Sequence, residues 1–183
     1  MKIPNILTLL RIALIPIFVV VFYLPYEWAP MATGIVFAIA GFTDWLDGYL
    51  ARKLDQSSPF GAFLDPVADK LMVAISLALL VESYGNLWVT IPAVVIIGRE
   101  IVISALREWM AEVGKRASVA VSYIGKVKTA LQMLAIMLMI VTEPYSSTIS
   151  WAGIVALYLA AILTLWSMYQ YLRAAWPHLS EDM

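Results

Sequence analysis

The sequence predicts an all-α membrane protein with six transmembrane helices, arranged as a single domain over residues 1–183. Hydrophobic residues make up 62% of the chain and charged residues 14%, whereas a soluble domain is usually about 45–50% apolar and about 25% charged. The apolar residues gather into six stretches close to the roughly 20 residues that cross a bilayer. Lys and Arg also collect in alternate connections, which is typical of multi-pass proteins. A very apolar soluble domain is the less favoured alternative.

The six expected helices follow one another with short connections. They cover residues 6–24, 31–51, 66–81, 87–106, 124–141 and 149–172. Proline, glycine and polar residues mark the joints between them, at Pro25 and Pro30, Ser57 to Pro59, Gly85 and Asn86, and Glu143 and Pro144. The first stretch lacks a clear small-residue cleavage site and is followed by further spans, so we expect a retained helix rather than a signal peptide.

The distribution of basic residues predicts the orientation. The first, third and fifth connections contain Glu27, Glu82 and Glu143 as their only charged residues. The basic residues of the other side are Lys2, Arg52, Lys53, Lys115, Arg116, Lys126 and Arg173. Because cytoplasmic connections are enriched in Lys and Arg, we expect both termini and the even-numbered connections in the cytoplasm. The net charge of −1 and the lack of a basic run give no sign of nucleic-acid binding.

Four aspartates interrupt this apolar pattern. Asp44 and Asp47 lie in the second expected span, and Asp65 and Asp69 at the start of the third. Spacings of three and four place each pair on one helix face, and a hairpin of antiparallel neighbours would bring all four together near the cytoplasmic end. Clustered carboxylates repel one another at low dielectric, so they need raised pKa values, basic partners or bound cations.

The chemistry of the ligands favours a hard divalent cation. The chain has no Cys, and its single His178 lies in the polar tail, so oxygen atoms are the available ligands and Mg²⁺, Mn²⁺ or Ca²⁺ the expected ions. Four carboxylates could hold two such ions, which suits chemistry on a phosphate. The alternative is a set of helix caps and salt bridges to Arg52, Lys53 and Lys70. Asp65 before Pro66 has the form of an N-cap with proline at the first helical position.

The residues around the aspartates resemble a known signature. It reads Asp44-x2-Asp47-Gly48-x2-Ala51-Arg52-x8-Gly61-x3-Asp65-x3-Asp69. This pattern resembles the signature of the CDP-alcohol phosphotransferase family at every fixed position and gap. The six spans expected here also match that family. The resemblance implies that Asp44, Asp47, Asp65 and Asp69 bind two divalent cations, Mg²⁺ or Mn²⁺, and that Asp69 is also the catalytic base. It implies that the CDP moiety contacts Thr8, Gly48, Ala51, Arg52 and Gly61. The implied reaction transfers a phosphatidyl group from CDP-diacylglycerol to an alcohol and releases CMP.

A group of basic residues indicates which alcohol could be the acceptor. Arg99 lies inside the fourth expected span with Arg107 eight residues later on nearly the same face, and Lys126 and Lys128 open the fifth. They could bind a phosphate on the acceptor, or Arg99 could pair with Glu100 and the aspartates instead. Four stretches resemble a bacterial branch of the family whose acceptor is sn-glycerol 3-phosphate, which implies the inner membrane and a homodimer. They are NIxTxxR with Asn5, Thr8 and Arg11, and residues 63–70, 99–109 and 125–129.

Two other functions remain open from the sequence. The same chemistry could serve another acceptor, such as phosphatidylglycerol in a cardiolipin-type synthase, an inositol phosphate or serine. A cation-coupled or proton-coupled transporter would also place carboxylates in the membrane, but transporters often contain paired interrupted helices in two halves. The sequence has no such symmetry, and its carboxylates are expected at one membrane face.

Overall fold

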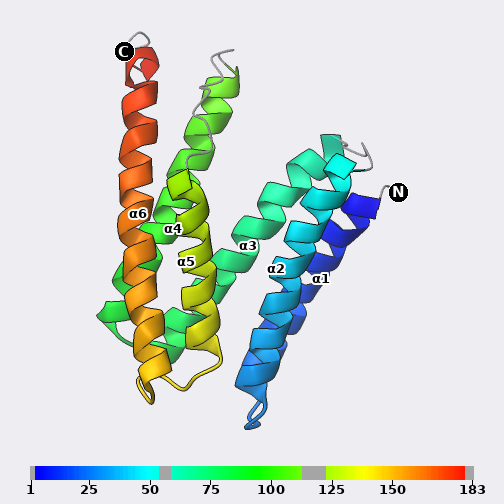
Figure 1. Cartoon of the computed structure of the whole chain (residues 1–183), viewed down its shortest axis with the longest axis vertical. Coiled ribbons are helices and arrows are strands. Elements are labelled where there is room, and N and C mark those ends of the chain that lie inside the picture. Colours follow the sequence, from blue (N-terminus) through cyan, green and yellow to red (C-terminus); the bar gives the residue numbers. More distant parts are fainter. Residues whose placement is uncertain (1–2, 54–58, 113–122, 180–183) are drawn as a thin grey trace.

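The regular structure of the chain is helical wherever the structure describes it. The computed structural model describes residues 3–53, 59–112 and 123–179. Within these ranges it contains no strand, and its helices are α1 (Ile3–Phe22), α2 (Ala29–Lys53), α3 (Pro59–Tyr84), α4 (Leu87–Glu112), α5 (Tyr123–Ile140) and α6 (Thr148–Leu179) (Figure 1). Each of the six expected apolar stretches therefore forms a helix, and the all-α prediction is confirmed for the described residues.

The helices differ in how well they suit a bilayer. Among the described residues, four segments are long and apolar enough to cross a membrane: Asn5–Phe22, Ala29–Leu50, Leu87–Glu112 and Thr148–Trp176. The 26-residue α3 contains Asp65, Asp69, Lys70 and Glu82, and the apolar part of α5 is the shorter segment Val127–Ile140. Length and composition thus indicate a multi-pass membrane protein, with four helices that meet the criterion for a span.

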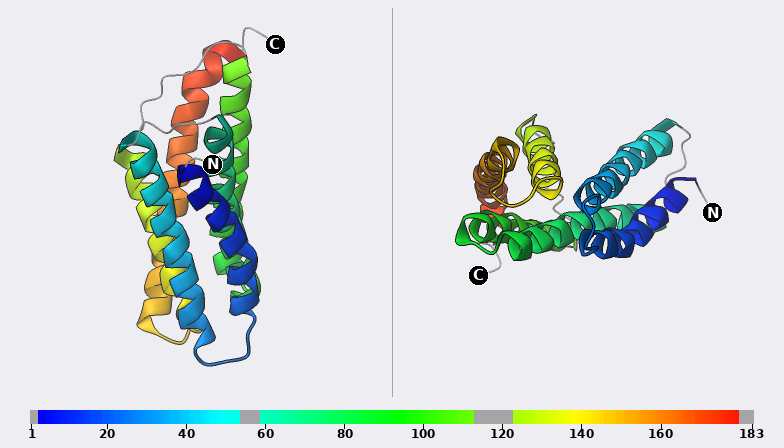
Figure 2. Two further views of the ribbon diagram at one scale, coloured as in Figure 1. Left: turned by 90° about the vertical axis from the view of Figure 1, so that its right-hand side faces the viewer. Right: turned by 90° about the horizontal axis from the view of Figure 1, so that it is seen from below.

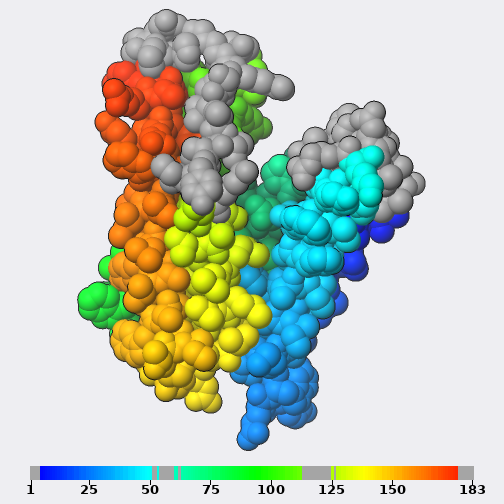
Figure 3. All heavy atoms as spheres, in the orientation of Figure 1, coloured from blue at the N-terminus to red at the C-terminus, as the bar shows by residue number. Residues whose placement is uncertain are grey.

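The helices are arranged in two layers. Seen from below, α1, α3 and α4 form one layer, and α2, α5 and α6 form the other (Figure 2). Along the chain, α1 packs against α2 and α3, while α6 packs against α4 and α5. The predicted antiparallel course of α2 and α3 is confirmed, but their direct contact is small because α1 packs against both. Figure 3 shows the surface hollowed between α2 and α5 toward the upper end.

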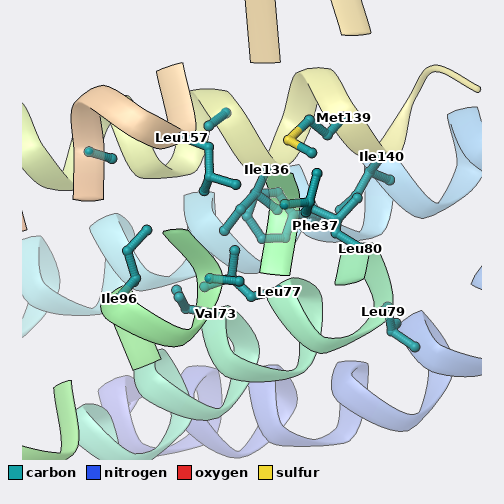
Figure 4. Close-up of a cluster of buried hydrophobic side chains, with 14 of the residues drawn as sticks. Phe37, Val73, Leu77, Leu79, Leu80, Ile96, Ile136, Met139, Ile140 and Leu157 are labelled. Carbon is teal, nitrogen blue, oxygen red and sulfur yellow. The ribbon is translucent and has the colours of Figure 1, made fainter. Parts of the chain in front are cut away.

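The apolar core lies in the lower half, where the helices converge. Every helix contributes a buried side chain to it: Phe18, Phe37, Leu77, Ile96, Ile136 and Leu157. Figure 4 labels all of these except Phe18. Membrane helices gain little from the hydrophobic effect when they associate, so close packing and dispersion contacts hold them together. The core therefore fixes the relative positions of six helices just below the polar residues of the upper half.

Glycines allow α5 to approach its neighbours closely. A Cβ atom on Gly34 of α2 would lie 2.4 Å from Val141 Cγ1, and one on Gly41 would lie 3.1 Å from Met133 Cε. Small residues permit such close approach between membrane helices. Helix α2 and the C-terminal half of α5 are therefore in close contact at these two glycines.

The start of the third helix differs from the prediction. It was expected at Pro66, but α3 begins at Pro59, and proline suits the first helical position because its missing N–H would be unpaired there. Asp65 and Pro66 therefore lie inside the helix, and the interpretation of Asp65 as an N-cap is wrong. Helix α6 also continues past its expected end, to Leu179, and α4 extends beyond its apolar stretch to Glu112, as an extension of this helix into the cytoplasm predicts. The expected basic connection with Lys115 and Arg116 lies outside the described residues.

Candidate active site

Polar side chains gather in the upper half of the molecule, above the core, and some of them are buried while others are exposed. Ionisable groups inside apolar helices are costly and are usually paired or functional. Here they form two clusters. The aspartate cluster consists of Thr8, Arg11, Asp44, Asp47, Asp65 and Asp69 on α1, α2 and α3. The cation cluster consists of Arg99, Glu100, Lys128 and Ser167 on α4, α5 and α6.

Arg11 of α1 joins the first two aspartates. Its Nη1 donates to Asp44 Oδ1 at 2.6 Å and its Nη2 donates to Asp47 Oδ2 at 2.5 Å. The Arg11 side chain is 2% exposed and that of Asp47 5%, while that of Asp44 is 47% exposed. The planar guanidinium suits two carboxylates at once. The prediction that Asp44 and Asp47 share a helix face is therefore confirmed.

The two aspartates of α3 reach the same region by separate contacts. Thr8 Oγ1 donates to Asp65 Oδ1 at 2.5 Å. Asp69 lines a cavity of about 140 Å³ together with Asp44 and Arg11, and Gly41 and Met133 form part of its wall. Asp44 and Asp69 thus face one cavity, Asp47 is connected to it through Arg11, and Asp65 is held by α1.

The aspartate cluster fits hard divalent cations by its donor atoms. Carboxylate oxygens are the ligands that Mg²⁺ and related ions prefer in proteins. Within the part of the chain that the structure describes, however, no three acidic or histidine side chains stand close enough to hold one ion together. Arg11 neutralises Asp44 and Asp47 instead. Since one guanidinium faces two of four carboxylates, the cluster keeps an excess of negative charge that would attract cations.

The cation cluster surrounds one carboxylate with two buried cations. Arg99 Nη1 donates to Glu100 Oε1 at 2.6 Å and Arg99 Nη2 to Ser167 Oγ at 2.8 Å. Lys128 Nζ donates to the same Glu100 oxygen at 3.1 Å. Arg99 and Lys128 are 9% and 6% exposed. The alternative pairing of Arg99 with Glu100 is therefore present, and the cluster contains two cationic side chains for one carboxylate.

A second cavity connects the two clusters. Its volume is about 40 Å³, and its polar lining residues are Asp69, Lys70, Glu100, Lys128, Thr129 and Gln132. It shares Asp69 and Thr129 with the larger cavity beside Asp44. Asp69 is therefore the carboxylate that stands between the aspartate cluster and the cation cluster.

The remaining predicted site residues are placed as follows. Arg107 is exposed, its guanidinium lies 5.4 Å from the ring centre of Tyr171, and neither cavity is lined by it. Gly48 follows Asp47 on α2, and Gly61 is buried near the start of α3. The side chains of Ala51, Arg52 and Lys126 lie outside the described part of the structure.

Sequence reasoning missed two residues of this region. Arg11 appeared only in a stretch that resembles the family, although an arginine inside an apolar helix always needs a partner and could have been singled out for that reason. The second residue is Gln132. It is buried on α5, four residues after Lys128 and on the same face, and this polar spacing was the available signal.

The aspartate cluster and the cation cluster border two adjacent cavities that Asp69 lines, and neighbouring groups of opposite charge can bind a substrate that contains phosphate groups. The chain belongs to the CDP-alcohol phosphatidyltransferase family, which matches residues 1–166. It is 61% identical over 183 residues to the CDP-diacylglycerol–glycerol-3-phosphate 3-phosphatidyltransferase of Pseudomonas fluorescens, covering 100% of this chain and 94% of that protein. The proteins of the same name from Salmonella typhimurium and Pectobacterium atrosepticum are 60% identical over 174 residues and 57% identical over 180 residues. These matches cover 95% and 98% of this chain and 94% and 98% of the relatives.

Proposed function

We propose that this chain transfers the phosphatidyl group of CDP-diacylglycerol to sn-glycerol 3-phosphate, forming phosphatidylglycerophosphate and CMP. The observation that supports this most strongly is the position of Asp69, which lines both the cavity beside Asp44 and the cavity beside Lys128. A base placed there can reach a donor on one side and an acceptor on the other. The relatives at 57–61% identity are named for this reaction.

The donor would bind at the aspartate cluster. Asp44, Asp47, Asp65 and Asp69 would hold two divalent cations, Mg²⁺ or Mn²⁺, which when bound would neutralise the pyrophosphate and stabilise the departing CMP. Arg11 keeps Asp44 and Asp47 in position.

The CDP moiety would contact the residues of the signature close to these aspartates. They are Thr8, Gly48, Ala51, Arg52 and Gly61. Thr8 supports this assignment because it hydrogen-bonds Asp65 and so lies in the aspartate cluster.

The acceptor would bind at the cation cluster. Arg99 and Lys128 offer charge-assisted hydrogen bonds to its phosphate, and we assign Lys126 and Arg107 to the same anion, with Arg107 further out beside Tyr171. Asp69 accepts the proton of the primary hydroxyl as that oxygen attacks the β-phosphorus. The bond from the β-phosphorus to the bridging oxygen breaks, and CMP leaves with the bonding electrons. In-line displacement of this kind depends mainly on positioning and charge.

The setting we propose is the inner membrane of a bacterium. All six helices, α3 and α5 included, would span it in one domain over residues 1–183, with the termini and the active site facing the cytoplasm because the basic residues lie on that side. The acyl chains of the donor could then stay in the bilayer while its head group enters the hollow. A homodimer is proposed from the family resemblance alone.

An acceptor panel tests the proposal. Purified protein receives radiolabelled CDP-diacylglycerol, Mg²⁺ or Mn²⁺, and one of sn-glycerol 3-phosphate, phosphatidylglycerol, an inositol phosphate or serine. We expect labelled phosphatidylglycerophosphate with the first acceptor, loss of this product in Asp69→Asn, and normal activity in Glu143→Gln, which changes an exposed residue at the opposite end. Product with another acceptor alone would refute the acceptor assignment. Absence of CMP release with every acceptor would leave the cation-coupled transporter as the better reading.

A further inference from the structure

Gln132 is a buried polar residue that the reaction as described does not use. It lies on α5 and is 5% exposed. Across residues 3–53, 59–112 and 123–179, its side-chain amide has no hydrogen-bond partner, and it lines the cavity between Asp69 and Lys128. Its amide is open to this cavity, because the fully buried side-chain atoms without a partner in the described residues belong to Arg11, Arg99 and Thr164. A polar group that faces a cavity can complete its hydrogen bonds with a bound ligand.

The position of Gln132 relative to Lys128 sets the size of that ligand. Four residues separate them on one helix face, so Gln132 lies one turn, about 6 Å of helix rise, deeper than Lys128. The next residue on this face is Ile136, which belongs to the apolar core. Gln132 is thus the deepest polar group on this face of α5, and Asp69 lines the same cavity from α3.

Glycerol 3-phosphate matches this spacing. With its phosphate at Arg99 and Lys128, the extended molecule spans about one helical turn from phosphorus to terminal hydroxyl, and that hydroxyl reaches Asp69. The secondary hydroxyl, in the middle of the molecule, then lies beside α5. A hydroxyl both donates and accepts a hydrogen bond, and so does the amide of glutamine.

We propose that the Gln132 amide hydrogen-bonds the secondary hydroxyl of the glycerol phosphate acceptor and selects a phosphorylated polyol over an alcohol phosphate that lacks this hydroxyl. This inference rests on the proposed function. Gln132 is a specificity-determining residue in this account, because it contacts a hydroxyl that does not react. Its loss lowers use of the natural acceptor without changing the chemistry at Asp69.

The test changes the protein and the acceptor together. Wild type and Gln132→Met are compared by kcat/KM for sn-glycerol 3-phosphate and for 3-hydroxypropyl phosphate, which differs only by lacking the secondary hydroxyl. Wild type prefers glycerol 3-phosphate by roughly tenfold, the size of one buried hydrogen bond. In Gln132→Met this preference is lost because kcat/KM falls for glycerol 3-phosphate alone. The KM for CDP-diacylglycerol stays constant. Methionine is unbranched and of similar length, so the helix packing is kept.

Controls separate this inference from a packing effect and from the proposed function. Gln170→Met, which changes an exposed glutamine on α6, keeps the wild-type preference, and Gln132→Leu repeats the test with another apolar shape. An equal drop on both acceptors in the Gln132 variants, or a wild type that uses both acceptors equally, overturns the role of Gln132. Transfer to neither acceptor by a wild type that releases CMP to another alcohol refutes the proposed acceptor itself.

Discussion

Replacing Arg11 by methionine removes the guanidinium that joins Asp44 to Asp47. In the wild type this group donates to both carboxylates at 2.6 and 2.5 Å. The variant keeps a long apolar side chain on α1, but it leaves the Asp47 carboxylate buried without its cationic partner. We therefore expect the variant to be less stable than the wild type when divalent cations are absent.

The two ion pairs contribute unequally to this loss. The Asp44 side chain is 47% exposed, so water screens it and its pair with Arg11 adds little. The Asp47 side chain is only 5% exposed, and removing one partner of a buried pair costs about 3–5 kcal/mol. For a chain of this size such a change lowers Tm by roughly 10 °C. Arg11→Lys keeps the charge but loses the fork of two donors, so its Tm should fall between those of wild type and Arg11→Met.

Thermal unfolding in detergent, followed by tryptophan fluorescence with EDTA present, measures this effect. Adding Mn²⁺ should raise the Tm of Arg11→Met more than that of the wild type, because bound cations then neutralise Asp44 and Asp47 in place of the guanidinium. Equal Tm values for wild type and Arg11→Met in EDTA would refute the reasoning that Arg11 is the partner of a buried Asp47.

Three further substitutions test other parts of the account. Asp69→Asn should lower CMP release at least about 100-fold, since a general base contributes roughly 10²- to 10⁴-fold, and it should keep the wild-type Tm within a few degrees. Lys128→Met should raise KM for glycerol 3-phosphate by about 10- to 100-fold, the size of a charge-assisted hydrogen bond, with KM for CDP-diacylglycerol unchanged. Gly153→Ala should cost about 1–3 kcal/mol of stability in a thermal melt, because its Cβ would lie 2.6 Å from Met139 Cγ and 3.3 Å from the backbone oxygen of Ala135.

Each of these results has a clear opposite. Full CMP release by Asp69→Asn would remove this residue from its role as base. A Lys128→Met enzyme whose KM rises equally for donor and acceptor would show a general distortion of the site. An unchanged melting temperature in Gly153→Ala would mean that α5 and α6 can move apart to admit the added methyl group without a loss of stability.

Much of the fold could be predicted because apolar length is a strong signal. Stretches such as residues 6–24 and 87–106 became α1 and α4. The start of α3 could not be read correctly, because Asp65 and Pro66 have the same local sequence whether they begin a helix or lie in its second turn. The segment of α3 forms a helix, but its charged residues lower its hydropathy below that of the four candidate spans. Two of these charged residues, Asp65 and Asp69, belong to the aspartate cluster.

The site was predictable where local spacing determines it. The interval between Asp44 and Asp47 places both on one face of a helix whatever surrounds it, and the contact of Glu100 with Arg99 is between chain neighbours. The bond of Arg11 to Asp47 joins residues 36 positions apart, and it depends on how α1 packs against α2. The position of Gln132 opposite Asp69 depends likewise on the packing of α5 beside α3. Neither follows from a local pattern.

The most direct measurement of the central claim follows the two phosphorus atoms of the donor. CDP-diacylglycerol labelled at either the α- or the β-phosphate is incubated with the protein, Mg²⁺ and sn-glycerol 3-phosphate, and lipid and water-soluble products are separated. Transfer of a phosphatidyl group predicts that the β-label appears in the new lipid, that the α-label appears in CMP, and that neither moves without the acceptor. Release of the β-label into the water-soluble products would contradict attack at the β-phosphorus, and with it the function proposed for this site.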